Sequence, residues 1–268
     1  MLFDFGAVTI SLYGILIATG FLAAYSVSFF CAKKRGLVHH VDRVILWALL
    51  PGILFARSLF VLYHPDYFLS HLLEIPAVWH GGWVWHGALA GGLLGIFLYC
   101  KENKIAFLSL LDVCAPGVAL GQSIGRWGNF FNQEAYGLPT NVPWGITIDP
   151  AHRLPGFEQF AVFHPAFLYE SIFDFGLFLF LLFMVKYLSS LRRRDPRLLG
   201  DDTSYTGATF FLYLTLYSIG RFGIEFFRID GVPIIMGLRS PQWISLGLIA
   251  LGVAGLVWVL HKQKKLVY

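Results

Sequence analysis

Seven long apolar runs dominate this chain of 268 residues and restrict the folds open to it. Each run is long enough, or nearly so, to cross a hydrocarbon core of ~30 Å as a helix that rises ~1.5 Å per residue. Because only 13% of the residues are charged and the mean hydropathy is +0.65, the sequence predicts an all-α polytopic membrane protein with seven transmembrane helices. The predicted spans are Val8–Cys31, Val44–Tyr63, Trp83–Cys100, Ile105–Gly121, Pro165–Tyr187, Thr206–Glu225 and Gln242–Leu260.

The distribution of basic residues predicts how these spans are oriented. Under a seven-span count, fourteen of the twenty basic residues lie at four junctions on the same side of the membrane. Cytoplasmic loops are enriched in Lys and Arg, so we expect the N-terminus outside and the C-terminus in the cytoplasm. The fourteen residues are Lys33, Lys34, Arg35, Arg43, Lys101, Lys104, Lys186, Arg192, Arg193, Arg194, Arg197, Lys262, Lys264 and Lys265.

The six other basic residues are all arginines, whereas all eight lysines belong to the cytoplasmic set. A guanidinium group is permanently charged and binds phosphate or carboxylate through paired hydrogen bonds. This selection indicates an anion site, although some of the six could instead pair with Glu134, Glu225 or Asp230. The six are Arg57, Arg126, Arg153, Arg221, Arg228 and Arg239.

Two stretches between the spans are long enough to form structure on the outer face. No internal repeat or domain boundary is evident, so we expect one integral-membrane domain over residues 1–268, with outer segments at about 64–82 and 122–164. The second segment exceeds ordinary loop lengths. It contains GRWGNFFNQEAYG, residues 125–137, an irregular polar stretch that can persist beside lipid only if it is buried in protein or lines a watery cavity. We therefore expect a structured outer-face segment that carries the functional site.

The sixth span carries polar residues at helical spacing. Tyr217, Arg221 and Glu225 recur every four residues, and Arg228 follows three later, so one helical face would carry all four. Charges inside a membrane usually face the bundle interior or a cavity. Two interpretations stay open: ligand binding by Arg221, or a structural ion pair between Arg221 and Glu225.

Two further groups of residues have a structural as well as a functional interpretation. His86 lies in WHGALAGG, whose glycines equally fit close packing between helices. Glu170 and Asp174 lie one helical turn apart in the fifth span, and we expect them to be mainly structural. No cluster has metal-ligand spacing and no nucleotide motif is present, so we expect no metal, no cofactor and no nucleic-acid partner.

The sequence from Gly125 to Glu134, together with Gly137, resembles the signature of the bacterial prolipoprotein diacylglyceryl transferases. The stretch around His86 looks like the His-Gly-Gly element of that family, although Ala88 replaces its usual second glycine. YSIGRFGIEFFR, residues 217–228, looks like the family's late Tyr-Arg-Glu segment. The resemblance extends over essentially the whole chain, in length, number of spans and orientation.

This resemblance implies an enzyme of the bacterial cytoplasmic (inner) membrane whose active site faces the outer side. Its substrates would be phosphatidylglycerol and a prolipoprotein signal peptide with a lipobox cysteine. The protein would also contact other membrane lipids. The reaction would transfer the sn-1,2-diacylglyceryl group to the cysteine thiol, form a thioether and release glycerol 1-phosphate, as the first step of lipoprotein maturation. The alternative from another class is a seven-span transporter or receptor that binds a phosphorylated or anionic ligand in an outer-leaflet cavity.

The implied reaction suggests a role for each candidate residue. A departing phosphate needs preorganised donors, and a thiol with a pKa of ~8.5 needs a base or a cation to become a thiolate. We expect Arg126 and Arg221 to hold the phosphate and His86 to activate the thiol, which makes these three the catalytic candidates. The substrate-binding candidates are Asn129 and Asn132 as neutral donors, Glu134 and Glu225 as carboxylates that orient arginines, Tyr13 and Tyr217 beside the headgroup, Gly137 as a turn residue, and Arg57 and Arg228.

Overall fold

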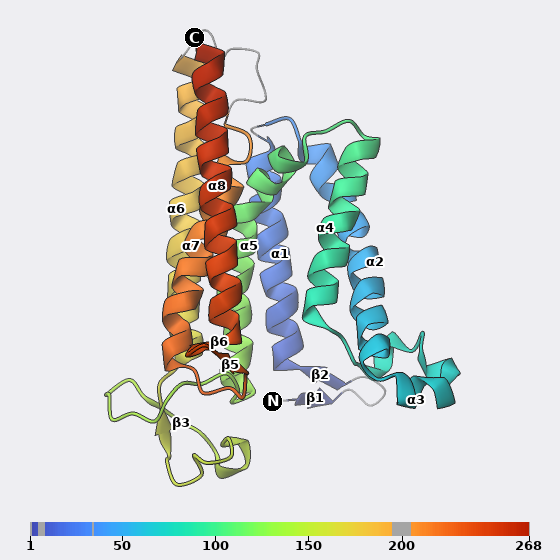
Figure 1. The fold of residues 1–268 in the computed structure, drawn as a ribbon, viewed down its shortest axis with the longest axis vertical. Helices are drawn as coiled ribbons and strands as arrows, with labels where there is room; N and C mark the ends of the chain where they lie inside the picture. Colours follow the sequence, from blue (N-terminus) through green and yellow to red (C-terminus); the bar gives the residue numbers. More distant parts are fainter. Residues whose placement is uncertain (1, 5–8, 34, 195–204, 268) are drawn as a thin grey trace. The chain divides into compact units, whose positions relative to one another are not determined.

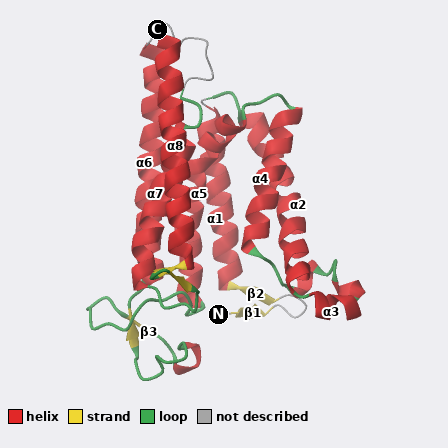
Figure 2. Ribbon diagram, in the orientation of Figure 1, coloured by secondary structure: helices red, strands yellow, loops and turns green. Residues whose placement is uncertain are grey.

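The computed structural model describes residues 2–4, 9–33, 35–194 and 205–267. The start of the first predicted span at Val8, as well as Lys34 and Arg197, lies outside the described residues. Long helices make up most of the described chain, as Figure 2 shows. The chain divides into two compact units: unit 1 comprises Met1–Cys31 and Leu111–Tyr268, and unit 2 comprises Ala32–Leu110.

Unit 1 contains most of α1 and α5 and the three long helices of the second half of the chain. The helices α6, α7 and α8 run side by side, and α7 packs along both of its neighbours (Figure 1). Small residues permit this packing, because a side chain at Gly252 or Gly255 of α8 would collide with Thr215 or Phe211 of α7. The bounds of the helices are α1 Leu12–Lys33, α5 Phe107–Phe131, α6 Ala166–Arg194, α7 Ala208–Ile224 and α8 Ser240–Val267.

The described residues of unit 1 also form three small antiparallel sheets of two strands each. The strands β1 (Leu2–Asp4) and β2 (Thr9–Ser11) pair with Leu2 opposite Ser11, and β3 (Ile146–Thr147) and β4 (Val162–Phe163) pair with Ile146 opposite Phe163. The strands β5 (Ile234–Ile235) and β6 (Leu238–Arg239) pair with Ile234 opposite Arg239. Two short 3-10 helices also belong to this unit, η3 (Pro150–His152) and η5 (Glu225–Phe227).

The segment between α5 and α6 has a small core of its own. Tyr136, Ile148 and Phe163 are buried against one another, and Leu154 and Phe157 pack around them. The hydroxyl of Tyr136 donates to the carbonyl of His152 at 2.8 Å and accepts from the backbone N–H of Leu154 at 2.7 Å. This long segment is therefore folded, as its length and composition predict.

Unit 2 is built on two long helices, α2 (Val38–Tyr63) and α4 (Trp85–Glu102), which pack along each other. Between them lie α3 (Pro65–Ser70), η1 (Leu72–Glu74) and η2 (Val78–His80). Gly87, Gly91 and Gly95 form one stripe on α4 that faces backbone carbonyls of α2, and a Cβ atom at Gly87 would lie 2.6 Å from the carbonyl oxygen of Phe55. The close helix approach that the glycines indicate is therefore present, and Ala88 does not prevent it.

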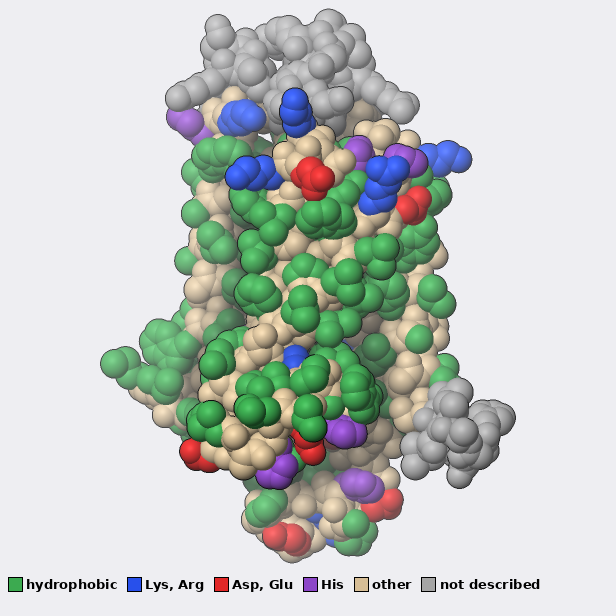
Figure 3. All heavy atoms as spheres, turned by 90° about the vertical axis from the view of Figure 1, so that its right-hand side faces the viewer, with side chains coloured by type: hydrophobic (Ala, Val, Ile, Leu, Met, Phe, Trp, Pro, Cys, Tyr) green, Lys and Arg blue, Asp and Glu red, His purple; other side chains and the backbone are tan. Residues whose placement is uncertain are grey.

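The helical architecture agrees with an all-α membrane protein. By length and composition, five described helices could cross a membrane: α1, α2, α5, α6 and α8. Of the other two predicted spans, α7 is a helix of 17 residues, and α4 is a helix of 18 residues that ends on Lys101 and Glu102. Figure 3 faces unit 2 and shows hydrophobic side chains over its middle, with Lys and Arg side chains gathered towards one end.

Two expectations about local structure were wrong. The polar stretch at residues 125–137 is not irregular throughout, because α5 continues ten residues past the predicted span end at Gly121 and includes Gly125–Phe131. A helix satisfies its backbone groups internally, so polar side chains do not require an irregular backbone there. In the sixth span, α7 ends at Ile224, and Arg228 has an extended backbone and does not continue the helical face.

Candidate active site

A buried carboxylate near the start of α6 gathers three arginines from three segments. The side chain of Glu170 is 3% exposed. Its Oε2 lies 2.6 Å from Nε of Arg126, and its Oε1 lies 3.0 Å from Nη1 of Arg221 and 2.8 Å from Nη1 of Arg228. Residues that are 102 positions apart in the chain, Arg126 and Arg228, thus share one counter-ion.

A second buried carboxylate extends this cluster. The Oε2 of Glu225 lies 2.7 Å from Nη2 of Arg221, so the ion pair that was one of the two open interpretations is present. The Oε1 of Glu225 accepts from Nε of Arg239 at 2.7 Å. The carboxylate of Asp230 pairs with Arg228 at 2.6 Å, and its backbone carbonyl accepts from Nη2 of Arg239 at 2.7 Å. We call Arg126, Arg221, Arg228, Arg239, Glu170, Glu225 and Asp230 the arginine network.

The fold places the arginine network where three helices of unit 1 end or begin. Arg126 comes from the last turns of α5, Glu170 from the start of α6, and Arg221 from the end of α7. Burial alone would lower the pKa of Arg228, but the carboxylates of Glu170 and Asp230 more than offset this effect and raise its pKa above the ordinary value. The ion pairs with these carboxylates supply the counter-charge that a buried guanidinium requires.

Arg126 retains unused donor capacity. Its side chain is 25% exposed, more than that of Arg221 or Arg228, and its ion pair to Glu170 runs through Nε. No hydrogen bond from its two terminal nitrogens reaches a described residue, so both can donate to a ligand. Terminal guanidinium nitrogens fit the paired oxygens of a phosphate.

The three polar side chains at the end of α5 bind one another. The Oε1 of Glu134 accepts from Nδ2 of Asn129 at 3.0 Å and from Nδ2 of Asn132 at 3.4 Å. Glu134 therefore orients two amides here, and none of its described contacts is with an arginine. Gln133 and Ala135 have φ angles of 51° and 57°, so this turn holds two non-glycine residues in the left-handed region. Such strained backbone is often found at functional sites.

Gly137 and Gly128 are sites of close approach. Gly137 pairs with Arg228 in an isolated β-bridge and donates its N–H to the carbonyl of His164 at 2.8 Å. A Cβ atom at Gly137 would lie 2.6 Å from the carbonyl oxygen of Phe227. At Gly128, a Cβ atom would lie 2.5 Å from the ring of Tyr13, so this glycine provides the space that the tyrosine occupies. Gly137 thus allows the close approach of the backbone beside Arg228.

Tyr217 lies one helical turn before Arg221 on α7. Its ring stacks on that of Tyr213, with the centroids 5.6 Å apart and an interplanar angle of 22°. The hydroxyl of Tyr213 donates to Oε1 of Gln122 at 3.0 Å, whereas the hydroxyl of Tyr217 has no hydrogen-bond partner among the described residues. Tyr217 can therefore offer a hydroxyl to a ligand.

The two remaining candidates, Arg57 and His86, belong to unit 2. His86 is the second residue of α4, and its side chain is exposed. Arg57 is 6% exposed and donates to four backbone carbonyls: from Nε to Ile75 at 2.9 Å, from Nη2 to Glu74 at 2.5 Å, and from Nη1 to Gly81 and Gly82 at 2.6 and 3.4 Å. Its guanidinium group is thereby engaged in holding the segment between α3 and α4.

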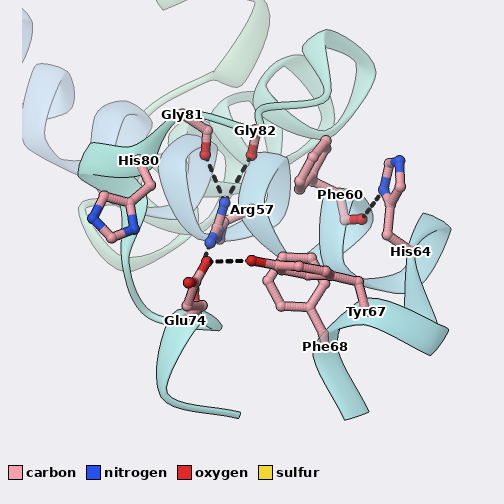
Figure 4. A pocket seen from close by; sticks show the side chains of 9 residues that line it. All are labelled: Arg57, Phe60, His64, Tyr67, Phe68, Glu74, His80, Gly81 and Gly82. Atoms are coloured by element: carbon pink, nitrogen blue, oxygen red, sulfur yellow. Dashed lines mark hydrogen bonds between the residues drawn. The ribbon is translucent and has the colours of Figure 1, made fainter. Parts of the chain in front are cut away.

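A hollow of about 350 Å³ opens beside Arg57 (Figure 4). The guanidinium carbon of Arg57 lies 5.2 Å from the ring centroid of Phe68 and 5.7 Å from that of Phe60, and the hydroxyl of Tyr67 donates to Oε2 of Glu74 at 3.0 Å. The lining residues are Arg57, Phe60, His64, Tyr67, Phe68, Glu74, His80, Gly81 and Gly82. Arg57 is thus already enclosed by aromatic rings and carbonyls of its own unit.

The sequence did not single out three members of the arginine network as site residues. Glu170 was expected to be mainly structural. Asp230 was considered only as a possible partner of an arginine, and Arg239 only as one of the six outer arginines. A signal for Glu170 was present, because a carboxylate inside a predicted span needs a partner and the outer arginines outnumber Glu134, Glu225 and Asp230. The sequence spacing between Glu225 and Arg239 follows no helical period. The two residues meet because the chain turns back in the β5–β6 hairpin.

The comparisons with known proteins agree on one family. A family model described as "Prolipoprotein diacylglyceryl transferase" matches residues 1–258. Three relatives named phosphatidylglycerol–prolipoprotein diacylglyceryl transferase illustrate the similarity. The protein of a Nostoc species is 40% identical over 99% of this chain and 91% of its own length. Those of Gloeobacter violaceus and Fervidobacterium nodosum are each 38% identical, over 99% and 98% of this chain and 94% and 86% of their own lengths.

Proposed function

The chain belongs to the prolipoprotein diacylglyceryl transferase family, and we propose that it transfers the diacylglyceryl group of phosphatidylglycerol to the lipobox cysteine of a prolipoprotein. Relatives that match nearly the whole length of this chain are named for this activity. The reaction makes the protein a transferase of lipoprotein biosynthesis.

The observation that carries this proposal is the arrangement of arginines around Glu170. Arg126, Arg221 and Arg228 converge on one buried carboxylate, and the terminal nitrogens of Arg126 remain free to donate. A phosphodiester carries one negative charge, and its glycerol phosphate product carries a second when the bond to the diacylglyceryl carbon breaks. Preorganised donors that face this growing charge lower the barrier, because they need no reorganisation during the reaction.

The bond changes of the reaction set what the residues must do. The thiolate sulfur attacks the sn-3 carbon of the diacylglyceryl group, the bond from that carbon to the phosphate oxygen breaks, and glycerol 1-phosphate leaves with that oxygen. Arg126 and Arg221 hold the phosphate, and Tyr217 and Arg228 contribute to the position of the headgroup. The thiol must lose its proton, and His86, as an exposed imidazole at the start of α4, is the base that we propose.

We propose that all seven long helices cross the bacterial cytoplasmic membrane, with the N-terminus outside. The four clusters of basic residues support this orientation. It places the arginine network and the folded segment between α5 and α6 on the outer side, where the cysteine of a translocated prolipoprotein is presented. Five helices have the length and apolar composition of spans. The other two, α4 and α7, have 18 and 17 residues.

Detection of the product tests this function. The purified protein is incorporated into vesicles of phosphatidylglycerol and phosphatidylcholine, and a synthetic peptide with a lipobox cysteine is added. We expect the peptide mass to increase by one diacylglyceryl group, glycerol 1-phosphate to appear in equal amount, and no product to form when phosphatidylglycerol is left out. Binding of the lipid without any thioether product would contradict the proposal and favour a binding protein.

A further inference from the structure

The connection between α7 and α8 ends in an apolar tip that nothing in the described structure covers. The strands β5 and β6 form a hairpin, and Ile234, Ile235 and Met236 at its tip are 70%, 51% and 88% exposed. The sequence from Val232 to Leu238, VPIIMGL, contains no charged residue and no polar side chain. An apolar tip of this kind is costly in water.

The turn of this hairpin fixes the direction of the tip. Met236 and Gly237 have φ angles of 49° and 79°, as a two-residue turn of type I′ requires at both central positions. Asparagine or glycine is the usual residue at the first of these positions, because a longer side chain resists a positive φ. Here the position holds a methionine that is almost fully exposed, so its side chain does not serve the packing of the described protein.

The base of the hairpin is tied to the arginine network. Arg239 donates to Glu225 and to the backbone carbonyl of Asp230, both at 2.7 Å, and the N–H of Ser240 donates to the carbonyl of Pro233 at 2.8 Å. At the start of α8, Nε1 of Trp243 donates to the carbonyl of Ile235 at 2.9 Å. The tip therefore cannot move freely relative to the network.

We propose that the tip of the β5–β6 hairpin is inserted among the acyl chains of the outer leaflet and acts as a membrane anchor for the arginine network. The hairpin lies at the end of α7 and the beginning of α8, both of which pack in unit 1, and Figure 1 shows it at that end of the two helices. Its apolar tip continues the lipid-facing surface of α8, whose Trp243 and Ile244 are exposed. A half-exposed tryptophan with its N–H satisfied is typical of the membrane interface.

A fixed insertion depth has a consequence for the site. Arg239 at the base of the hairpin shares Glu225 with Arg221. The anchor thereby holds the outer end of the network at a constant depth, close to where lipid phosphates lie. The anchor requires that α7 and α8 cross the membrane in the proposed orientation, but it does not require the proposed reaction, so the two can fail or succeed separately.

Depth-dependent fluorescence quenching tests the anchor. In the full-length protein, Cys31, Cys100 and Cys114 are replaced by alanine, Met236→Cys is introduced, and the thiol is labelled with bimane. The protein is placed in vesicles of phosphatidylglycerol and phosphatidylcholine in which part of the phosphatidylcholine carries a nitroxide on an acyl chain. Since Met236 is exposed and touches little of the protein, the substitution should leave the fold intact.

The matched control is Gln159→Cys, an exposed position in the segment between β3 and β4. We expect acyl-chain nitroxide to quench the label at position 236 at least twofold and aqueous iodide to quench it weakly, with the reverse at position 159. Iodide quenching at position 236 as strong as at position 159, without nitroxide quenching, would place the tip in water and overturn the proposal. Protection of position 236 from both quenchers would place it against protein and overturn the proposal equally.

Discussion

Arg126 and Arg221 differ in how fully the protein uses them, and this difference matters for their roles. Arg221 bridges Glu170 and Glu225 through two of its nitrogens, whereas among the described residues the ion pair of Arg126 runs through Nε alone. We propose that Arg126 offers both terminal nitrogens to the phosphate and that Arg221 contributes to phosphate binding while it organises the network. Both tasks need the planar fork of arginine, which a lysine ammonium does not reproduce.

We predict that Arg126→Lys and Arg221→Lys each lower turnover by about 100-fold, as the loss of a transition-state donor does elsewhere. Both variants should still insert and fold. The control is Arg153→Lys, because Arg153 donates to the carbonyls of Ile148 and Glu158 and does not contact the network. Turnover in a vesicle assay provides the measurement, and near-normal rates in both network variants would rule out bidentate phosphate binding.

Glu170 is the single counter-ion that three arginines share, so its charge should matter for stability as well as activity. We expect Glu170→Gln to destabilise the protein by about 3 kcal/mol, because buried guanidinium groups lose their compensation. The thermal unfolding midpoint in detergent would report this change. Glu158→Gln is the control, since Glu158 is exposed on the segment between β3 and β4. Equal midpoints for the two variants would show that Glu170 is not the centre of the network.

The role of His86 as the base makes a prediction about pH. His86→Gln should lower turnover strongly at neutral pH, and turnover should recover in part as the pH rises towards the pKa of ~8.5 of a free thiol, because hydroxide then supplies the thiolate. The pH profile of turnover in both proteins is the measurement. A defect that is independent of pH and is accompanied by weaker binding of phosphatidylglycerol would reassign His86 to the lipid headgroup.

At the scale of elements, the packing of α2 against α4 depends on individual glycines. A Cβ atom at Gly95 would collide with the carbonyl of Trp47, whereas one at Gly92 would lie 3.5 Å from the carbonyl oxygen of Ala48, an ordinary contact. We predict that Gly95→Ala lowers stability by about 1–3 kcal/mol through overpacking and that Gly92→Ala has little effect. Thermal unfolding of the two variants tests this, and equal unfolding midpoints would contradict the observed packing.

The sequence predicted the elements better than their ends. Hydropathy located all seven long helices because an apolar run of this length has few alternatives, but it could not tell that α5 continues through Gly125–Phe131. Polar residues there suggested a loop, although a helix can carry them wherever its own backbone is satisfied. The end of α7 at Ile224 was missed for the converse reason, since the four-residue spacing continues for one turn after the helix has stopped.

Only part of the candidate site could be predicted from the sequence. Two segments that resemble family motifs singled out Arg126 and Arg221 as candidates, and the spacing of Arg221 and Glu225 allowed for the ion pair that they form. The shared contacts at Glu170 and the link from Arg239 to Glu225 were not predictable, because they join segments that are distant in the chain. Long-range ion pairs depend on how helices pack, and periodicity within one helix contains no information about that packing.

For the molecule as a whole, the decisive property is the side of the membrane on which the arginine network lies. A thiol that has been translocated can react only at a site that is open to the outside. Four clusters of basic residues predict that side, but one missed or additional span would invert every segment after it. The proposed roles of the network residues therefore depend on this orientation.

Labelling of single cysteines in intact cells is the direct test of this orientation. In a background without native cysteines, cysteine replaces one of four exposed residues: Asn141, Gly231, Lys101 or Lys262. With a membrane-impermeant maleimide added outside, we expect cysteines at positions 141 and 231 to react at once, and those at 101 and 262 to react only after permeabilisation. Protection of positions 141 and 231 together with labelling of position 262 would place the arginine network on the cytoplasmic side and contradict the account.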